Sequence, residues 1–311
     1  MTCHSVFAVF QQRAGRGRRS WPLWPVYALL LSTYAMASAS PARLIVLSPH
    51  LVELVYSIGA GSQIVATVAH ADYPAEARQL PVVGDYRGLQ LEQIVSLQPD
   101  VVLYWRAGTP AQDIEQLEKL GIKVLGFDAK TPADIAASLR QLGQLLQLTA
   151  RTEPLARQTE QQLSQIKQRW QQASKVRVFY ELWDQPLSSI GPGAWPAHLL
   201  QLCGAENLLA DAAVPYPQLS AELLFARQPQ LILQPVSKGE PRTLVDWQGQ
   251  FSQLEAVRHQ QIQQIDADAL HRATLRTVAA IEQLCQQIDQ SRQYWQRRQR
   301  PATSGLATAT Q

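Results

Sequence analysis

GLQLEQIVSLQPDVVLYW, residues 88–105, and PQLSAELLFARQPQLILQP, residues 217–235, are two versions of one sequence pattern. When the first residue of the second segment is skipped, the two align without gaps at a constant offset, since Glu92 meets Glu222 and 222 − 92 = 130. In both, a helical stretch stops before a proline, which cannot continue a helix, and an apolar run typical of a buried strand follows. This duplication predicts two similar α/β lobes.

The same alternation of short apolar runs and helical segments continues along the chain. The runs are RLIVLS, QIVATV, DVVLYW and IKVLGFD in the first half, and VRVFYELW, LILQPV and IQQIDAD in the second. Strands that alternate with helices form βα units around a largely parallel sheet. Residues 149–173 contain no glycine and keep a helical apolar period, which predicts one long helix. We therefore expect an α/β fold with two similar lobes, one long bridging helix and a ligand cleft between the lobes.

The first forty residues have the composition of a secretory signal peptide. A basic stretch precedes an apolar run, which two prolines cut to roughly a dozen residues, short of the ~20 that a membrane-spanning helix needs. Small residues place cleavage near Ser38 or Ser40, and the general secretory and twin-arginine routes both stay open. The expected divisions are a signal peptide (1–39), an N-terminal α/β lobe (40–148), a bridging helix (149–174), a C-terminal α/β lobe (175–295) and a flexible tail (296–311).

Removing this leader changes the charge of the chain. It takes away four of the 28 Lys and Arg and none of the 25 Asp and Glu, which leaves 24 − 25 = −1. The remaining chain has no basic excess that would favour nucleic acid. We expect a periplasmic protein that is monomeric when free and binds no nucleic acid.

Two cysteines, Cys203 and Cys285, remain after the leader with Cys3 is removed. An even number in an oxidising compartment indicates one disulfide, and two separate buried thiols are the alternative. Ligands of open α/β sheets bind outside the carboxyl ends of the strands. Candidate site residues therefore follow the segments LSPH, ATVAH, GDY, LYW, FYELW and IDAD.

The order and spacing of several segments resemble the periplasmic cobalamin-binding proteins of ABC importers, within the wider clan that includes siderophore- and haem-binding proteins. The resemblance covers residues 43–287, and its segments are LSPHLVELVYSIGAG, ADYP, GLQLEQIVSLQPDVV, WRAG, LGIKV, LCGAENLL, VPYPQLSAELLFAR and LHRATLR. It implies two Rossmann-like lobes bridged by a rigid helix, a disulfide between Cys203 and Cys285, and cobalamin as ligand rather than as a cofactor.

The resemblance also implies ligand contacts. A corrin ring is a broad and mostly apolar plate, so it needs aromatic walls and a few hydrogen-bonding groups at its edge. Trp105 matches a tryptophan that lines the family's cleft, and Tyr86 and Tyr216 stand where a well-known member has tryptophans. The residues expected at the ligand are His50, His70, Tyr86, Trp105, Tyr216, Asp268 and Arg272, with His271 as a further candidate.

The sequence departs from the family pattern at three positions. His70 replaces a ligand-contacting tyrosine, and a neutral imidazole could either approach the cobalt or serve as a polar cleft residue. Ser188 falls near a family aromatic, so Trp183 or Trp195 is the alternative for that wall. Leu275 replaces a proline.

Glu92 and Glu222 lie near the starts of equivalent expected helices, where a helix dipole favours negative charge. One acid on each lobe can also meet two identical arginine sites on a dimeric membrane partner. In the family, glutamates at these positions dock on the permease, so the resemblance implies this role here.

Three other functions compete with cobalamin binding. A ferric siderophore or haem is the alternative ligand within the binding class. A zinc or manganese site would need converging His, Asp or Glu, for which His50, His70 and His198 are candidates, and we expect no metal site. An enzyme is not expected, because the sequence has no Gly-rich phosphate loop, nucleophile elbow or metalloprotease spacing.

Overall fold

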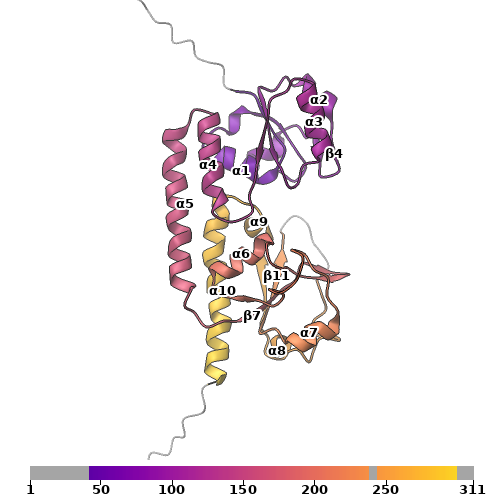
Figure 1. Cartoon of the computed structure of the whole chain (residues 1–311), viewed down its shortest axis with the longest axis vertical. Helices are drawn as coiled ribbons and strands as arrows, with labels where there is room; N and C mark the ends of the chain where they lie inside the picture. The colour runs from indigo at the N-terminus through magenta and orange to yellow at the C-terminus, as the bar shows by residue number, and fades with distance from the viewer. Residues whose placement is uncertain (1–41, 238–243, 300–311) are drawn as a thin grey trace, which may run out of the picture. The chain divides into compact units, whose positions relative to one another are not determined.

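A computed structural model describes residues 42–237 and 244–299 of the chain (Figure 1). All the described residues belong to one compact unit, which lies within residues 41–311. The expected signal peptide and its cleavage sites lie outside the described residues, as does most of the expected tail. Within the described ranges, no helix has the length and apolar character to cross a membrane.

Two four-stranded parallel sheets form the centres of the two lobes. The first sheet has the order β2-β1-β5-β6, built from β1 (Leu44–Val46), β2 (Ile64–Thr67), β5 (Val101–Trp105) and β6 (Val124–Phe127). The second has the order β10-β7-β11-β12, built from β7 (Arg177–Tyr180), β10 (Glu206–Asn207), β11 (Leu231–Val236) and β12 (Ile262–Asp266). Each strand of the first sheet therefore has a counterpart at the same place in the second, which confirms the expected duplication.

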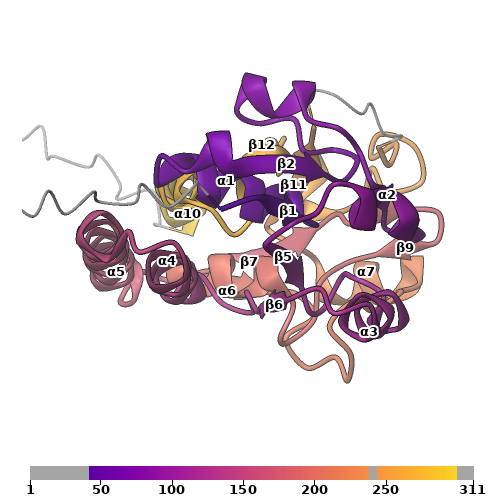
Figure 2. The same cartoon turned by 90° about the horizontal axis from the view of Figure 1, so that it is seen from above.

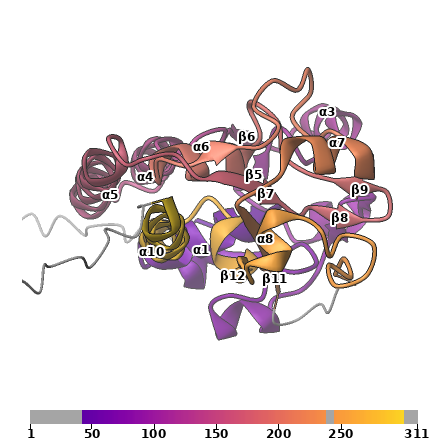
Figure 3. The same cartoon turned by 90° about the horizontal axis from the view of Figure 1, so that it is seen from below.

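Helices flank both sheets. In the first lobe they are α1 (Pro49–Ser57), α2 (Leu91–Ser96), α3 (Ala111–Lys119) and α4 (Asp134–Leu145), with 3-10 turns at Gly61–Gln63 and Ala75–Gln79 and a hairpin of β3 (Gly84–Asp85) and β4 (Gly88–Leu89) (Figure 2). In the second they are α6 (Trp195–Leu202), α7 (Ala221–Arg227), α8 (Glu255–Arg258), α9 (Ala267–Leu270) and α10 (Leu275–Gln299), with a hairpin of β8 (Trp183–Asp184) and β9 (Leu187–Ser188) (Figure 3).

The duplicated pattern extends to backbone detail. Gln98 and Gln228, which precede the two aligned prolines, have positive φ angles of 47° and 44°. In each lobe an arginine holds this turn: Arg43 donates to the carbonyl of Leu97 at 2.8 Å, and Arg177 donates to the carbonyl of Gln228 at 3.0 Å. The two helix-to-strand turns therefore share one conformation and one kind of support.

The long helix α5 (Thr149–Trp170) contacts a glycine of each lobe, which confirms the expected bridging helix (Figure 1). Gly59 follows α1 and lies under Arg151, and Gly204 follows α6 and lies under the carbonyl of Trp170. Both glycines have positive φ angles, which favour glycine. At Gly204 a Cβ would also lie 2.2 Å from the backbone oxygen of Trp170, so a larger residue has no room there.

One apolar core and one disulfide hold this arrangement. Leu163 and Ile166 of α5 belong to the same buried cluster as Leu44 of β1 and Val178 of β7. Cys203 at the end of α6 and Cys285 in α10 form the expected disulfide. The bond joins two helices that contact each other, and both cysteines are fully buried.

Candidate functional site

A cavity of about 730 Å³ lies at the carboxyl ends of the strands of both lobes. Its size falls within the range of small-molecule sites. The first lobe contributes His50, Trp105, Ala107, Ala129, Lys130 and Thr131, and the second contributes Leu182, Gly193, Trp195, Pro196, His198, Tyr216, His271 and Ala273. The expected cleft between the lobes is therefore present, with an aromatic wall on each side.

His50 lies at the start of α1, between Ser48 and Trp105. Its Nδ1 is 2.5 Å from Ser48 Oγ, and its ring meets the Trp105 indole in a T-shaped contact with 5.6 Å between ring centroids. Burial, and secondly the positive charge of Arg272, lowers the pKa of His50 to about 4. Its Nε2 has no hydrogen-bond partner among the described residues. His50 is thus a neutral imidazole that supports the Trp105 wall.

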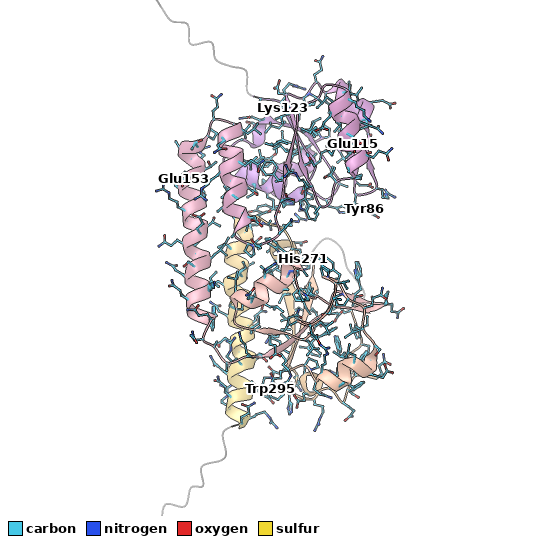
Figure 4. The ribbon with its side chains drawn as sticks, viewed as in Figure 1. Tyr86, Glu115, Lys123, Glu153, His271 and Trp295 are labelled. Carbon is cyan, nitrogen blue, oxygen red and sulfur yellow. A yellow bond between two sulfur atoms is a disulfide. The ribbon has the colours of Figure 1, made fainter. Side chains whose placement is uncertain are left out.

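Trp105 separates the main cavity from a side pocket. The side pocket has a volume of about 190 Å³ and contains His70 and Tyr86, and Trp105 is the residue that lines both spaces. Tyr86 is 79 % exposed at the turn between β3 and β4, where Figure 4 labels it at the edge of the first lobe. The expected aromatic residues therefore form two groups, with Trp105 and Tyr216 in the main cavity and Tyr86 beside it.

Arg272 points toward the first lobe and not into the cavity. Its Nη1 donates to Asp72 Oδ1 at 2.6 Å and to Glu53 Oε1 at 3.0 Å, and its Nη2 donates to the carbonyl of His70 at 3.4 Å. Asp268 lies in the first turn of α9, and neither residue lines the main cavity. In this structure Arg272 ties the two lobes together beside the cavity.

The second wall comes from Trp195, the first residue of α6. Its indole Nε1 donates to the carbonyl of Leu270 at 2.7 Å, which fixes the ring at the cavity. Trp183, the other candidate for this wall, is 59 % exposed on β8 and does not line the cavity. Ser188 is buried and donates to the carbonyl of Pro186. Of the two candidate tryptophans, Trp195 is therefore the one that lines the cavity.

His271 is placed by the second sheet. Its Nε2 lies 2.6 Å from the Tyr180 hydroxyl at the end of β7, and Figure 4 shows it at the edge of the second lobe that faces the cavity. His198 also lines the cavity, whereas His70 lies in the side pocket. Within residues 42–237 and 244–299, His, Cys, Asp and Glu form no group of three that could hold a metal ion.

Sequence reasoning missed Lys130, Thr131 and Leu182 as cavity residues. Lys130 and Thr131 follow β6, and Leu182 follows β7, so the rule that ligands bind at strand ends contained the signal for all three. Glu92 and Glu222 are exposed in the first turns of α2 and α7, at the equivalent places that the alignment predicts.

The strand order, the bridging helix and the cavity between two lobes define a class of two-lobed ligand-binding proteins. A sequence profile described as "Periplasmic binding protein" matches residues 44–269, and the chain belongs to this family. Its members bind substrates for transport.

Individual relatives indicate which periplasmic binding proteins this chain is similar to. The chain is 33 % identical over 261 residues to a vitamin B12-binding protein of Vibrio parahaemolyticus, covering 84 % of this chain and 94 % of the relative. It is 36 % identical over 262 residues to a vitamin B12-binding protein of Pectobacterium carotovorum, covering 84 % and 92 %. The crystal structure of the periplasmic vitamin B12-binding protein BtuF of Vibrio cholerae matches with a TM-score of 0.73 at 31 % identity, covering 81 % and 98 %.

Haem-binding proteins share the fold. The periplasmic haem-binding protein HutB of Vibrio cholerae matches with a TM-score of 0.70 at 22 % identity, covering 80 % of this chain and 99 % of that one. At this identity the likeness concerns the arrangement of the lobes and not the residues of the cavity.

Proposed function

We propose that this protein captures cobalamin in the main cavity and delivers it to an ABC importer in the inner membrane. The observation that carries the proposal is the cavity itself, whose opposite sides present Trp105 and Trp195 at a volume of about 730 Å³. A corrin is a wide apolar plate, and indole rings offer large flat surfaces with little conformational entropy to lose. The relatives named as vitamin B12-binding proteins support the same ligand.

The proposed roles of the individual residues follow their positions. Trp105 and Tyr216 form walls of the main cavity, with His50 behind Trp105. His70 and Tyr86 line the side pocket and meet a part of the ligand that extends past Trp105. Asp268 and Arg272 stay predicted ligand contacts, and Arg272 would reach the ligand by exchanging one of its present carboxylate partners.

The delivery step uses the exposed acids Glu92 and Glu222. Each lies in the first turn of a helix, one per lobe. The pKa of Glu222 is lowered, first by a hydrogen bond from the Ser220 hydroxyl, so its carboxylate stays charged. We propose that the two carboxylates bind equivalent basic sites on paired permease subunits.

We also propose how the chain is exported and organised. Residues 1–39 direct export and are removed, and the mature protein is monomeric in the periplasm until it meets the permease. The divisions at 40–148, 149–174, 175–295 and 296–311 describe its parts, and its task is binding without catalysis. The α5 bounds and the two sheets support these divisions.

Calorimetric titration of the mature protein with cyanocobalamin, cobinamide, haem and a ferric siderophore tests the ligand assignment. We expect cyanocobalamin to bind with a dissociation constant below about 10 µM, which corresponds to about −7 kcal/mol. Haem or the siderophore binding more tightly than every corrinoid would overturn the assignment.

Two substitutions at Trp105 locate the site. Trp105→Ala removes the flat wall and should weaken cyanocobalamin binding by at least about tenfold, because aromatic anchors dominate such contacts. Trp105→Phe keeps an aromatic ring and should retain most of the affinity. Equal affinity in the wild type and Trp105→Ala would place the ligand elsewhere.

A further inference from the structure

The part of the main cavity's lining that the structure describes contains basic groups and no acid. Its described lining contains one lysine and three histidines and neither Asp nor Glu. His50 is held neutral by burial, and Lys130 is the one Lys or Arg among the described lining residues. An ammonium group in the lining favours a ligand that carries an anion.

Lys130 is placed by the loop between β6 and α4. Asp134 Oδ2, in the first turn of α4, accepts the backbone N–H groups of Lys130 and Thr131 at 2.9 and 2.8 Å and also the Thr131 hydroxyl. The backbone at Lys130 is therefore anchored while its side chain is exposed at the cavity.

The acids near this loop have partners of their own. Asp134 is engaged by the loop backbone, and Asp128 pairs with Arg106 at 3.3 Å. The Lys130 ammonium makes no ion pair with any residue in the described ranges. It is a cation at the cavity mouth that no described carboxylate neutralises.

We propose that Lys130 binds the phosphodiester of the nucleotide loop of a complete cobalamin, so that the cavity favours corrinoids with this loop over cobinamide, which lacks it. The proposal rests on the proposed function and adds the chemical class of corrinoid that the site selects. A positive side chain at the cavity rim and one phosphate oxygen form a charge-assisted contact that salt weakens.

The test compares two ligands and three proteins. Titrations with cyanocobalamin and dicyanocobinamide are run on the wild type, Lys130→Met and Lys130→Arg at 50 and 500 mM salt. Lys130→Met should weaken cyanocobalamin binding about fivefold at the lower salt, with a smaller loss at the higher salt, because exposed charge pairs contribute modestly and are screened. Lys130→Arg should keep the wild-type affinity, and dicyanocobinamide should bind all three alike.

A matched control variant tests whether the effect is specific to Lys130. Lys119→Met removes an exposed lysine on α3 that lines no cavity described here, and should leave both affinities unchanged. If Lys130→Met weakens both corrinoids equally, or neither, the phosphodiester contact is wrong while cobalamin binding stands. If the wild type binds neither corrinoid, the proposed function itself fails.

Discussion

Arg276 of α10 donates two hydrogen bonds to Glu53 of α1, from Nε to Oε2 at 2.9 Å and from Nη2 to Oε1 at 2.6 Å. The side chain of Glu53 is 3 % exposed, and Arg272 donates to the same carboxylate. These contacts join the first lobe to the segment that follows β12. The two lobes are therefore held by a buried charge cluster beside the cavity as well as by α5.

Replacing Glu53 by Gln should destabilise the protein markedly. The amide cannot compensate two guanidinium groups, and removing one partner of a buried ion pair leaves the other charge without compensation, at a cost of about 3 kcal/mol. Urea unfolding measures the loss. Asp85→Asn, which breaks the exposed pair of Asp85 with Arg87, is the control and should have a far smaller effect. Equal losses in the two variants would show that the Glu53 cluster does not stabilise the fold.

Stability should fall as the pH drops from about 6.5 to 4, and His50 should be one cause. Its pKa is lowered to about 4 in the folded protein. In the unfolded chain the pKa of His50 is near its ordinary value of 6.5, so in this window the unfolded state binds the proton first and gains stability. The loss attributable to His50 is about 3 kcal/mol by pH 4.

His50→Gln isolates this effect, because it removes the titrating group and leaves the other acids and bases in place. Urea unfolding of both proteins at pH 7, 6, 5 and 4 should show a shallower decline for the variant. Parallel declines in the two proteins would contradict a neutral, buried His50.

The disulfide should contribute substantially to stability. Cys203 and Cys285 are separated by 82 positions, and closing a loop of that length lowers the entropy of the unfolded chain, which stabilises the fold by about 4.5 kcal/mol on the entropic account. The Cys203→Ala, Cys285→Ala double variant should unfold at a correspondingly lower urea concentration. Adding a reductant should lower the midpoint of the wild type and leave that of the variant in place. A reductant effect on both proteins would mean that another process is being measured.

The docking proposal predicts a separation of uptake from binding. Charge reversal at both acids, Glu92→Lys with Glu222→Lys, should abolish cobalamin uptake by cells, because like charges would then face each other at the permease. Cobalamin affinity should stay near that of the wild type, because neither acid lines the main cavity. Unchanged uptake by the double variant would refute the docking role.

Much of the fold could be predicted from the sequence, because its strands and helices have recognisable local sequence patterns. The offset of 130 residues located β5 and β11, and the glycine-free segment located α5. The cysteine pair was predictable because two thiols in an oxidising compartment leave one pairing.

The site was less predictable, since its residues come together through packing between the lobes. Arg272 carries no local sign that it turns toward Glu53 and Asp72 instead of the cavity. Lys130 has no local sign of a ligand contact apart from its position after the strand β6. The direction of the Arg272 side chain depends on Glu53, which lies more than 200 positions away in the sequence.

A crystal structure of the mature protein grown with cyanocobalamin is the sharpest test of the proposed ligand site. One corrinoid should lie in the cavity between the lobes, with its ring in van der Waals contact with Trp105 and Trp195. A corrinoid bound outside this cavity, or a cavity that stays free of it at saturating concentration, would disprove the proposed site.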